Sequence, residues 1–259
     1  MRFRSLQDWF FGLYVRHGGD PRPPWFLNFV GGERFDELGL GHFKNVRTIA
    51  AARPDDRVLD VGCGIGRVAL HFAKFLGEHG RYDGFDAVRL GVDWCNARIA
   101  RRDPRFRFVH VDVYNRQYNP NGLLDAASFS FPYDDEKFSL VYATSVLTHL
   151  LPDAAAQYLK EISRVLEPGG RSLVTYFIIN DDSRRHMTKS GGLCFQPTEE
   201  GYWTTQPENP EAAVAYEERA VWSMYDQASL EIQAPIRYGS WSGRDGLVGG
   251  QDHVLASKP

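Results

Sequence analysis

Residues 58–67, which read VLDVGCGIGR, constrain this chain more than any other stretch. A short apolar run carries an acid, three glycines follow at every second position, and a helical pattern begins after them. This order predicts a buried strand, a tight turn without side chains and a helix N-terminus. The turn presents bare backbone N–H groups to a ligand, while Asp60 beside it suits a ligand with an ammonium group better than a pyrophosphate.

Strands and helices alternate from residue 57 to residue 179. We expect strands at 57–61, 81–86, 106–111, 138–143 and 171–179, and helices at 66–77, around Val92, Cys95 and Ile99, and at 153–166. Pro168-Gly169-Gly170 is expected to stop the last of these helices before the next strand. Such alternation predicts an α/β fold, a mostly parallel sheet with helices on both faces.

The flanking segments are predicted to complete a single domain over residues 1–259. Residues 1–52 form a helical cap, with Trp9, Phe10, Leu13 and Tyr14 on one helical face and a second helix at 33–52. The same segment could also form a wall of the substrate pocket, and we favour its role as a cap. The core covers 53–179. Residues 180–210 are expected to be irregular and to act as a lid, and 211–259 to hold a helix (211–229) and two strands (230–240 and 250–257).

Three acids stand at the C-terminal ends of the first three predicted strands, at a spacing of one strand-helix unit. Asp60, Asp86 and Asp112 lie 26 residues apart in each case. Ligands of open parallel sheets bind beyond the carboxyl ends of the strands, so these acids are expected to share one site. Each acid alone could be an ordinary turn or N-cap residue. Because the spacing is regular and begins at the glycine turn, we favour a common site.

These residues resemble the first motifs of the class I S-adenosylmethionine-dependent methyltransferases. The resemblance implies a Rossmann-like fold of seven strands and S-adenosyl-L-methionine as the cofactor. It implies that Asp60, Gly62, Cys63, Gly64 and Gly66 face the methionine moiety, that Asp86 accepts the ribose hydroxyls, and that Asp112 and Val113 meet the adenine, with Thr144 also at the cofactor. Residues 114–120 and 238–244 further resemble a bacterial group of small-molecule or glycan methyltransferases.

In this family the segment after the fourth strand faces the methyl acceptor. Here it reads TSVLTHL over residues 144–150, and His149 is the candidate general base because an imidazole titrates near neutrality. A capping or packing role for His149 is the alternative, and His253, Tyr133 and Tyr142 are other candidates. No Asn-Pro-Pro-Tyr motif follows the strand, and no acids stand at Thr144 and Ser145 to hold a metal. We therefore predict metal-independent O-methylation of a small-molecule or sugar hydroxyl.

Two other functions stay open. Residues 64–69 fit the dinucleotide fingerprint G-x-G-x-x-A, which would make the chain an NAD(P)-dependent oxidoreductase. A pyrophosphate would then lie close to Asp60 with only Arg67 as a basic partner, and Asp112 would have no evident role. A non-catalytic methyltransferase-like binding subunit is the other alternative, which the retained cofactor residues disfavour.

The composition limits the partners and the compartment. The chain has 30 basic and 33 acidic residues, so its net charge of −3 gives no excess for binding nucleic acid. Cys63, Cys95 and Cys194 form no metal pattern and predict reduced thiols in a cytoplasmic protein. No apolar stretch approaches the roughly 20 residues of a membrane span, and no signal peptide is evident. We expect a small-molecule or glycan acceptor, without a nucleic acid or membrane partner; the oligomeric state is open.

Overall fold

The computed structural model describes residues 21–24, 32–187, 192–246 and 248–259. The predicted helical face with Trp9, Phe10, Leu13 and Tyr14 lies outside these residues. The second helix of the predicted cap is present as α2 (Phe35–Ile49), after a single 3₁₀ turn at Gly32–Arg34.

A seven-stranded sheet in the order β10-β11-β5-β4-β1-β2-β3 forms the centre of the protein. The five strands from β5 to β3 pair in parallel, and β11 and β10 add two antiparallel pairings at one edge. The predicted α/β class with a mostly parallel seven-stranded, Rossmann-like sheet is confirmed. The strands are β1 (Arg57–Val61), β2 (Arg81–Asp86), β3 (Phe106–His110), β4 (Phe138–Ala143), β5 (Leu166–Tyr176), β10 (Glu231–Ile232) and β11 (Asp252–Ser257).

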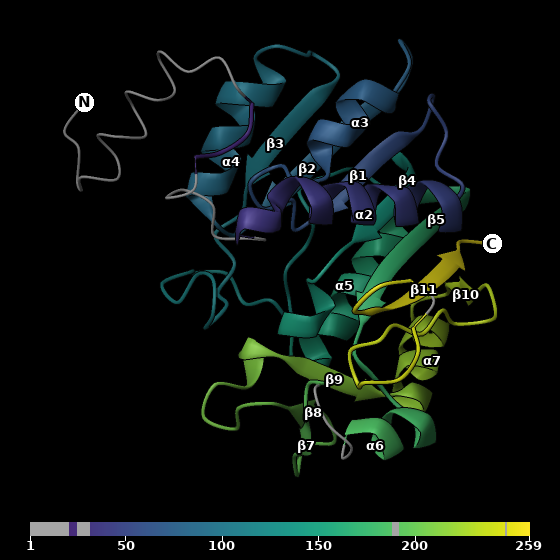
Figure 1. Cartoon of the computed structure of the whole chain (residues 1–259). Coiled ribbons are helices and arrows are strands. Elements are labelled where there is room, and N and C mark those ends of the chain that lie inside the picture. The colour runs from purple at the N-terminus through teal and green to yellow at the C-terminus, as the bar shows by residue number, and fades with distance from the viewer. Residues whose placement is uncertain (1–20, 25–31, 188–191, 247) are drawn as a thin grey trace.

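Helices cover both faces of this sheet because successive strand residues point to opposite sides. On one face Val58 and Leu140 pack with α2, α3 (Ala69–Phe75) and α4 (Arg89–Cys95), which continues as a π-helical turn at Asn96–Ala100. On the other face Leu59 and Val141 pack with α5 (Pro152–Val165) and α7 (Glu218–Gln227). Figure 1 shows α2 crossing the sheet on the same side as α3.

The segment after β5 differs from the prediction. Residues 180–210 were expected to be irregular, but they contain α6 (Asp181–Met187) and two short strands of a second, four-stranded sheet in the order β6-β9-β8-β7. The helix predicted at 211–229 is likewise wrong in its first part, which forms a 3₁₀ turn and then a strand. The second sheet consists of β6 (Ile178–Ile179), β7 (Gln196–Pro197), β8 (Trp203–Thr204) and β9 (Val214–Glu217), and Figure 1 shows it with α6 at the end of the molecule away from α3 and α4.

Smaller differences concern where elements begin and end. β5 already begins at Leu166, directly after α5, so Pro168-Gly169-Gly170 lies within the strand instead of before it. Only Glu231–Ile232 of the predicted strand 230–240 pairs in the sheet, apart from one bridge between Arg237 and His253. Among the described residues, no helix is long and apolar enough to cross a bilayer.

Candidate active site

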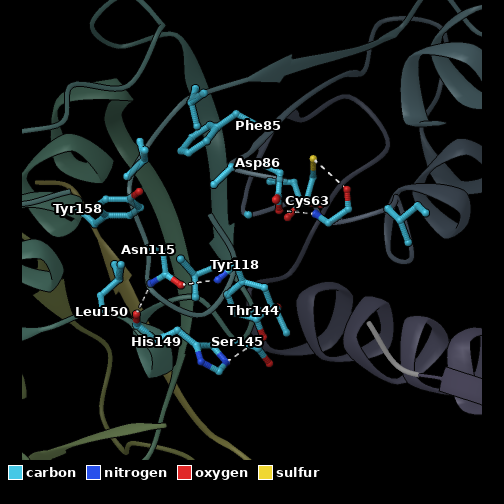
Figure 2. Close-up of a pocket in the computed structure, with 18 of the residues that line it drawn as sticks. Cys63, Phe85, Asp86, Asn115, Tyr118, Thr144, Ser145, His149, Leu150 and Tyr158 are labelled. Carbon is cyan, nitrogen blue, oxygen red and sulfur yellow. Dashed lines mark hydrogen bonds between the residues drawn. The ribbon is translucent and has the colours of Figure 1, made fainter. Parts of the chain in front are cut away.

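A cavity opens at the carboxyl ends of β1, β2 and β4. It has a volume of about 1010 Å³, including the part open to solvent. Figure 2 shows Cys63 and Asp86 at one end of the lining residues and His149 at the other. The cavity therefore lies where parallel sheets bind ligands.

The glycine turn after β1 forms one wall of the cavity. Gly62 and Gly64 line it with positive φ values of 75° and 56°, a conformation that side chains disfavour. The N–H groups of Gly62 and Cys63 donate to the carbonyl of Phe85 at 2.9 and 3.0 Å, which ties the turn to the end of β2. A Cβ on Gly62 would lie 2.4 Å from Cγ2 of Val146, so this position requires glycine.

Gly66, the third glycine of the turn, has a different role. Its φ is 83°, yet it is not among the residues that line the cavity. A Cβ at this position would lie 2.7 Å from Cδ1 of Ile99 and 2.9 Å from Sγ of Cys95. Gly66 therefore lets the turn pack against α4, and its predicted contact with the cofactor has no support in the geometry.

Asp60 lines the cavity but is only 3% exposed. Its Oδ2 accepts a 2.5 Å hydrogen bond from the Tyr82 hydroxyl, which also lies 2.5 Å from the Tyr142 hydroxyl. Burial raises the pKa of the Asp60 carboxyl to about 7, although the hydrogen bonds of Tyr82 and Tyr142 lower it. A cation placed beside this carboxyl would shift it to the charged form.

Asp86, the last residue of β2, organises the turn as well as facing the cavity. Its Oδ2 accepts from the Gly64 N–H and its Oδ1 accepts from the Val88 N–H, each at 2.7 Å. Burial raises the pKa of this carboxyl, while the two backbone hydrogen bonds oppose the shift. Each carboxylate oxygen retains a second lone pair, so the group can still accept hydrogen bonds from a ligand.

Asp112 does not join the other two acids. Val111 and Val113 line the cavity, but Asp112 between them does not. Its Oδ1 accepts from Nδ2 of Asn119 at 3.1 Å, and its carbonyl accepts from the N–H groups of Leu123 and Leu124. Asp112 thus holds the segment after β3 in place, and its predicted contact with the adenine lacks geometric support. Val113 and Thr144 line the cavity, and their contacts with the cofactor stay predictions.

His149 lies on the 3₁₀ turn Leu147–His149 and lines the cavity. Its Nδ1 is 2.9 Å from the carbonyl of Glu211, which accepts the ring proton. Its Nε2 then accepts from the Tyr118 hydroxyl, 3.4 Å away. Burial lowers the pKa of the imidazole, which keeps it neutral at neutral pH.

The other candidate bases are less suitably placed. His253 is only 3% exposed, lies outside the cavity lining, and its Nε2 is 3.1 Å from the Nδ2 donor of Asn45. Tyr133 is buried in the core and also lies outside the lining. Tyr142 lines the cavity but its hydroxyl is bonded to Tyr82.

Several lining residues carried no clear signal in the sequence. Tyr118 and Asn115 come from the segment after β3, and Asn115 bonds both the carbonyl of His149 and Oε1 of Glu211. These contacts join positions up to 96 residues apart, which a periodicity analysis cannot detect. Arg67 was noted only as a basic neighbour of the turn, although it also lines the cavity.

Comparison with known proteins supports the family resemblance. A family model described as a methyltransferase domain matches residues 58–170, the part that holds the glycine turn, Asp60 and Asp86. Residues 58–170 therefore match a methyltransferase domain, and the glycine turn and sheet order resemble those of the class I S-adenosylmethionine-dependent methyltransferases. The match supports the predicted cofactor, S-adenosylmethionine.

A curated relative of this chain is named for its methyl acceptor. A sterol 24-C-methyltransferase of Gibberella zeae is 30% identical over 162 residues, 61% of this chain but 38% of that protein. The chain thus spans only about two fifths of the length of such curated relatives.

Solved structures share the fold. The PH0226 protein of Pyrococcus horikoshii has a TM-score of 0.59 at 16% identity, covering 95% of this chain and 99% of its own. A 1,6-didemethyltoxoflavin-N1-methyltransferase of Burkholderia thailandensis, solved with its substrate and S-adenosylhomocysteine, has a TM-score of 0.54 at 18% identity, covering 100% of this chain and 92% of its own.

Proposed function

We propose that this protein transfers the methyl group of S-adenosylmethionine to a hydroxyl of a small molecule or sugar without a metal ion. The observation that carries the proposal is the meeting of the glycine turn with two carboxyls, the buried Asp60 and the half-buried Asp86, at one cavity. The turn and Asp60 would hold the methionine moiety, and Asp86 would accept the ribose hydroxyls. When bound, the cofactor supplies the methyl group and, as a sulfonium, the driving force for its transfer.

His149 is the group that would take the proton of the acceptor hydroxyl. Because Nδ1 is committed to the carbonyl of Glu211, the basic lone pair is on Nε2, which faces Tyr118 and the cavity. The lowered pKa keeps Nε2 unprotonated at neutral pH. A general base needs both this charge state and access to the acceptor.

The mouth of the cavity suits an acceptor with an apolar part. Tyr114 lines the cavity and is 43% exposed, and Leu123 and Leu124 in the same segment are 85% and 45% exposed. Leu124 lies beside Tyr114, whose N–H donates to the Leu124 carbonyl at 2.8 Å, so these residues form an exposed apolar surface at the lining. A nucleic acid acceptor finds no support in this surface.

A carbon acceptor is the second candidate, and the sterol 24-C-methyltransferase relative favours it. The structural neighbour of this chain from Burkholderia thailandensis is named as an N1-methyltransferase, so the fold alone does not determine the acceptor atom. In the described residues no group of three or more His, Cys, Asp or Glu side chains is placed to hold a metal ion. The metal-independent reaction and the oxygen acceptor stay predictions.

Calorimetric titration with S-adenosylhomocysteine, NAD⁺ and NADP⁺ tests the cofactor assignment. We expect binding of S-adenosylhomocysteine alone, and preferential binding of a dinucleotide would favour the oxidoreductase. Turnover is then followed as S-adenosylhomocysteine formation with panels of hydroxyl, amine and activated carbon acceptors, with the products identified by mass spectrometry. Cofactor binding without turnover on any panel would favour the non-catalytic binding subunit.

A further inference from the structure

Arg67 is a half-buried charged residue in the lining of the cavity. Among the described lining residues it is the only arginine or lysine. Its guanidinium makes no hydrogen bond or ion pair with any residue that the structure describes, although the residue is half-buried. A guanidinium carries five N–H donors in a planar fork that matches a carboxylate.

Helix α2 holds this arginine against the cavity. Gly39 of α2 is buried, and a Cβ there would lie 2.6 Å from the carbonyl oxygen and 2.8 Å from Cγ of Arg67. The helix backbone therefore packs directly on the arginine and on the start of its side chain. One turn further along α2, burial lowers the pKa of His42 to about 3, with Arg67 and His253 acting in the same direction. His42 is therefore neutral and adds no second cation.

On the cavity side, Arg67 lies near two tyrosines and an acid. Burial lowers the pKa of its guanidinium, while the charges of Asp60, Tyr142 and Tyr118 act to raise it. Even so, Asp60 and Arg67 form no ion pair, and the carboxyl of Asp60 is bonded to the Tyr82 hydroxyl. The carboxyl of Asp60 and the guanidinium of Arg67 thus face the same cavity without pairing with each other.

These charges complement the methionine end of the cofactor. The cavity offers two carboxyls, Asp60 and Asp86, and one guanidinium. S-adenosylmethionine carries two positive groups, the ammonium and the sulfonium, and one carboxylate. If Asp60 faces the ammonium, Arg67 is the remaining lining group able to neutralise the carboxylate, and the site with its cofactor then has no net charge.

We propose that Arg67, supported by Gly39 of α2, binds the α-carboxylate of the cofactor; this assignment rests on the function proposed above. It gives α2 a role as a wall of the cofactor site in addition to covering the sheet. It also leaves the acceptor end free of a fixed cation, which fits a neutral acceptor.

Calorimetry on the full chain tests the assignment with two ligands, S-adenosylhomocysteine and 5′-methylthioadenosine, which lacks the amino-acid part. Arg67→Gln should weaken S-adenosylhomocysteine binding about 10- to 100-fold, as expected for hydrogen bonds between charged groups. It should leave 5′-methylthioadenosine binding unchanged. Arg67→Lys, which keeps the charge but loses the fork, should fall between. Arg219→Gln, an exposed arginine of α7, is the matched control.

The outcomes separate this assignment from the function itself. Equal weakening of both ligands by Arg67→Gln, at an unchanged melting temperature, would mean that the arginine only shapes the turn and would overturn the proposal. Unchanged binding of S-adenosylhomocysteine would overturn it too. If added phosphate or benzoate then stabilised the S-adenosylhomocysteine-saturated wild type but not Arg67→Gln, the anion would belong to the acceptor. Failure of the wild-type protein to bind either ligand would instead refute the proposed function, and this proposal with it.

Discussion

The Tyr82 hydroxyl lies 2.5 Å from Oδ2 of Asp60 and 2.5 Å from the Tyr142 hydroxyl, in a buried chain of hydrogen bonds that ends at the cavity. Because the Tyr82 hydroxyl donates its proton in a hydrogen bond to Asp60, the Tyr142 hydroxyl is the donor to the Tyr82 oxygen. The chain supports a carboxyl that burial would otherwise leave costly to ionise. Near neutral pH, Asp60 is therefore present in both its neutral and its charged form.

Cofactor binding is expected to release a proton from Asp60. The pKa of this carboxyl is about 7 in the free protein, and a neighbouring ammonium group would lower it. At pH 6 the free carboxyl is mostly protonated, so binding should release up to about one proton. Calorimetry in two buffers of different ionisation enthalpy measures this number. It should vanish near pH 9 and in Asp60→Asn, and proton release that persists in Asp60→Asn would assign it to another group.

The same carboxyl should make the free protein less stable as the pH rises. Its pKa is raised from 3.8 to about 7 on folding, so the unfolded chain ionises first. The stability contributed by the neutral carboxyl is complete below about pH 4 and is lost as the pH rises through 7. Urea unfolding of wild type and Asp60→Asn between pH 4 and 8 tests this. The difference in unfolding free energy between the two should change with pH in this window, and a constant difference would contradict the raised pKa.

Asp86 and Asp112 form a matched pair for the ribose contact. Asp86→Asn replaces one acceptor oxygen by a donor that opposes the N–H of Gly64 or Val88, and it removes a charged partner of the ribose. Hydrogen bonds to charged groups contribute roughly 1.5–3 kcal/mol, so S-adenosylhomocysteine affinity should fall at least about tenfold. Asp112→Asn should change it little, because Asp112 does not line the cavity. Equal losses in the two variants would argue that Asp112 reaches the ligand.

Gly64 and Gly66 should respond differently to the same substitution. Gly64→Ala places a methyl group on a lining residue with φ of 56°, so we expect weaker S-adenosylhomocysteine binding. Gly66→Ala puts a methyl group against Ile99 and Cys95 of the α4 region, so we expect mainly a lower melting temperature. Thermal unfolding and calorimetry on both variants separate the two effects. A Gly66→Ala protein with normal stability but poor binding would place Gly66 at the ligand.

The main sheet could be predicted from the sequence because its strands are short apolar runs that alternate with amphipathic helices. β4, for example, is buried at every position, and the run from 138 to 143 is almost wholly apolar. The second sheet could not be predicted, since β7 and β8 have two residues each and show no period. β9 follows an alanine-rich stretch that favours a helix, and only pairing with β6 and β8 makes it a strand.

At the site, the sequence identified residues whose position follows from the strand that carries them. Asp60 and Asp86 lie within β1 and at the end of β2, so their approach to the glycine turn could be foreseen. Asp112 lies beyond the end of β3, where a shift of one residue reverses the direction of the side chain. His149 is bonded to Tyr118 and Glu211, which come from distant segments of the chain. The folding of these segments depends on tertiary contacts that a single sequence does not reveal.

The base assignment is tested best by His149→Asn. Asparagine can keep a donor toward the carbonyl of Glu211, the partner of Nδ1, while removing Nε2. If His149 is the general base, kcat should fall by about 10²–10⁴-fold, with S-adenosylmethionine affinity nearly unchanged. Because burial lowers the pKa of this imidazole, the wild-type rate at saturating cofactor should begin to fall only below pH 6.5, the usual value for histidine. His253→Asn, outside the cavity lining, should keep this profile. An unaltered rate and pH profile in His149→Asn would remove the histidine from proton transfer and favour an acceptor that needs no base, such as an already acidic hydroxyl or an activated carbon.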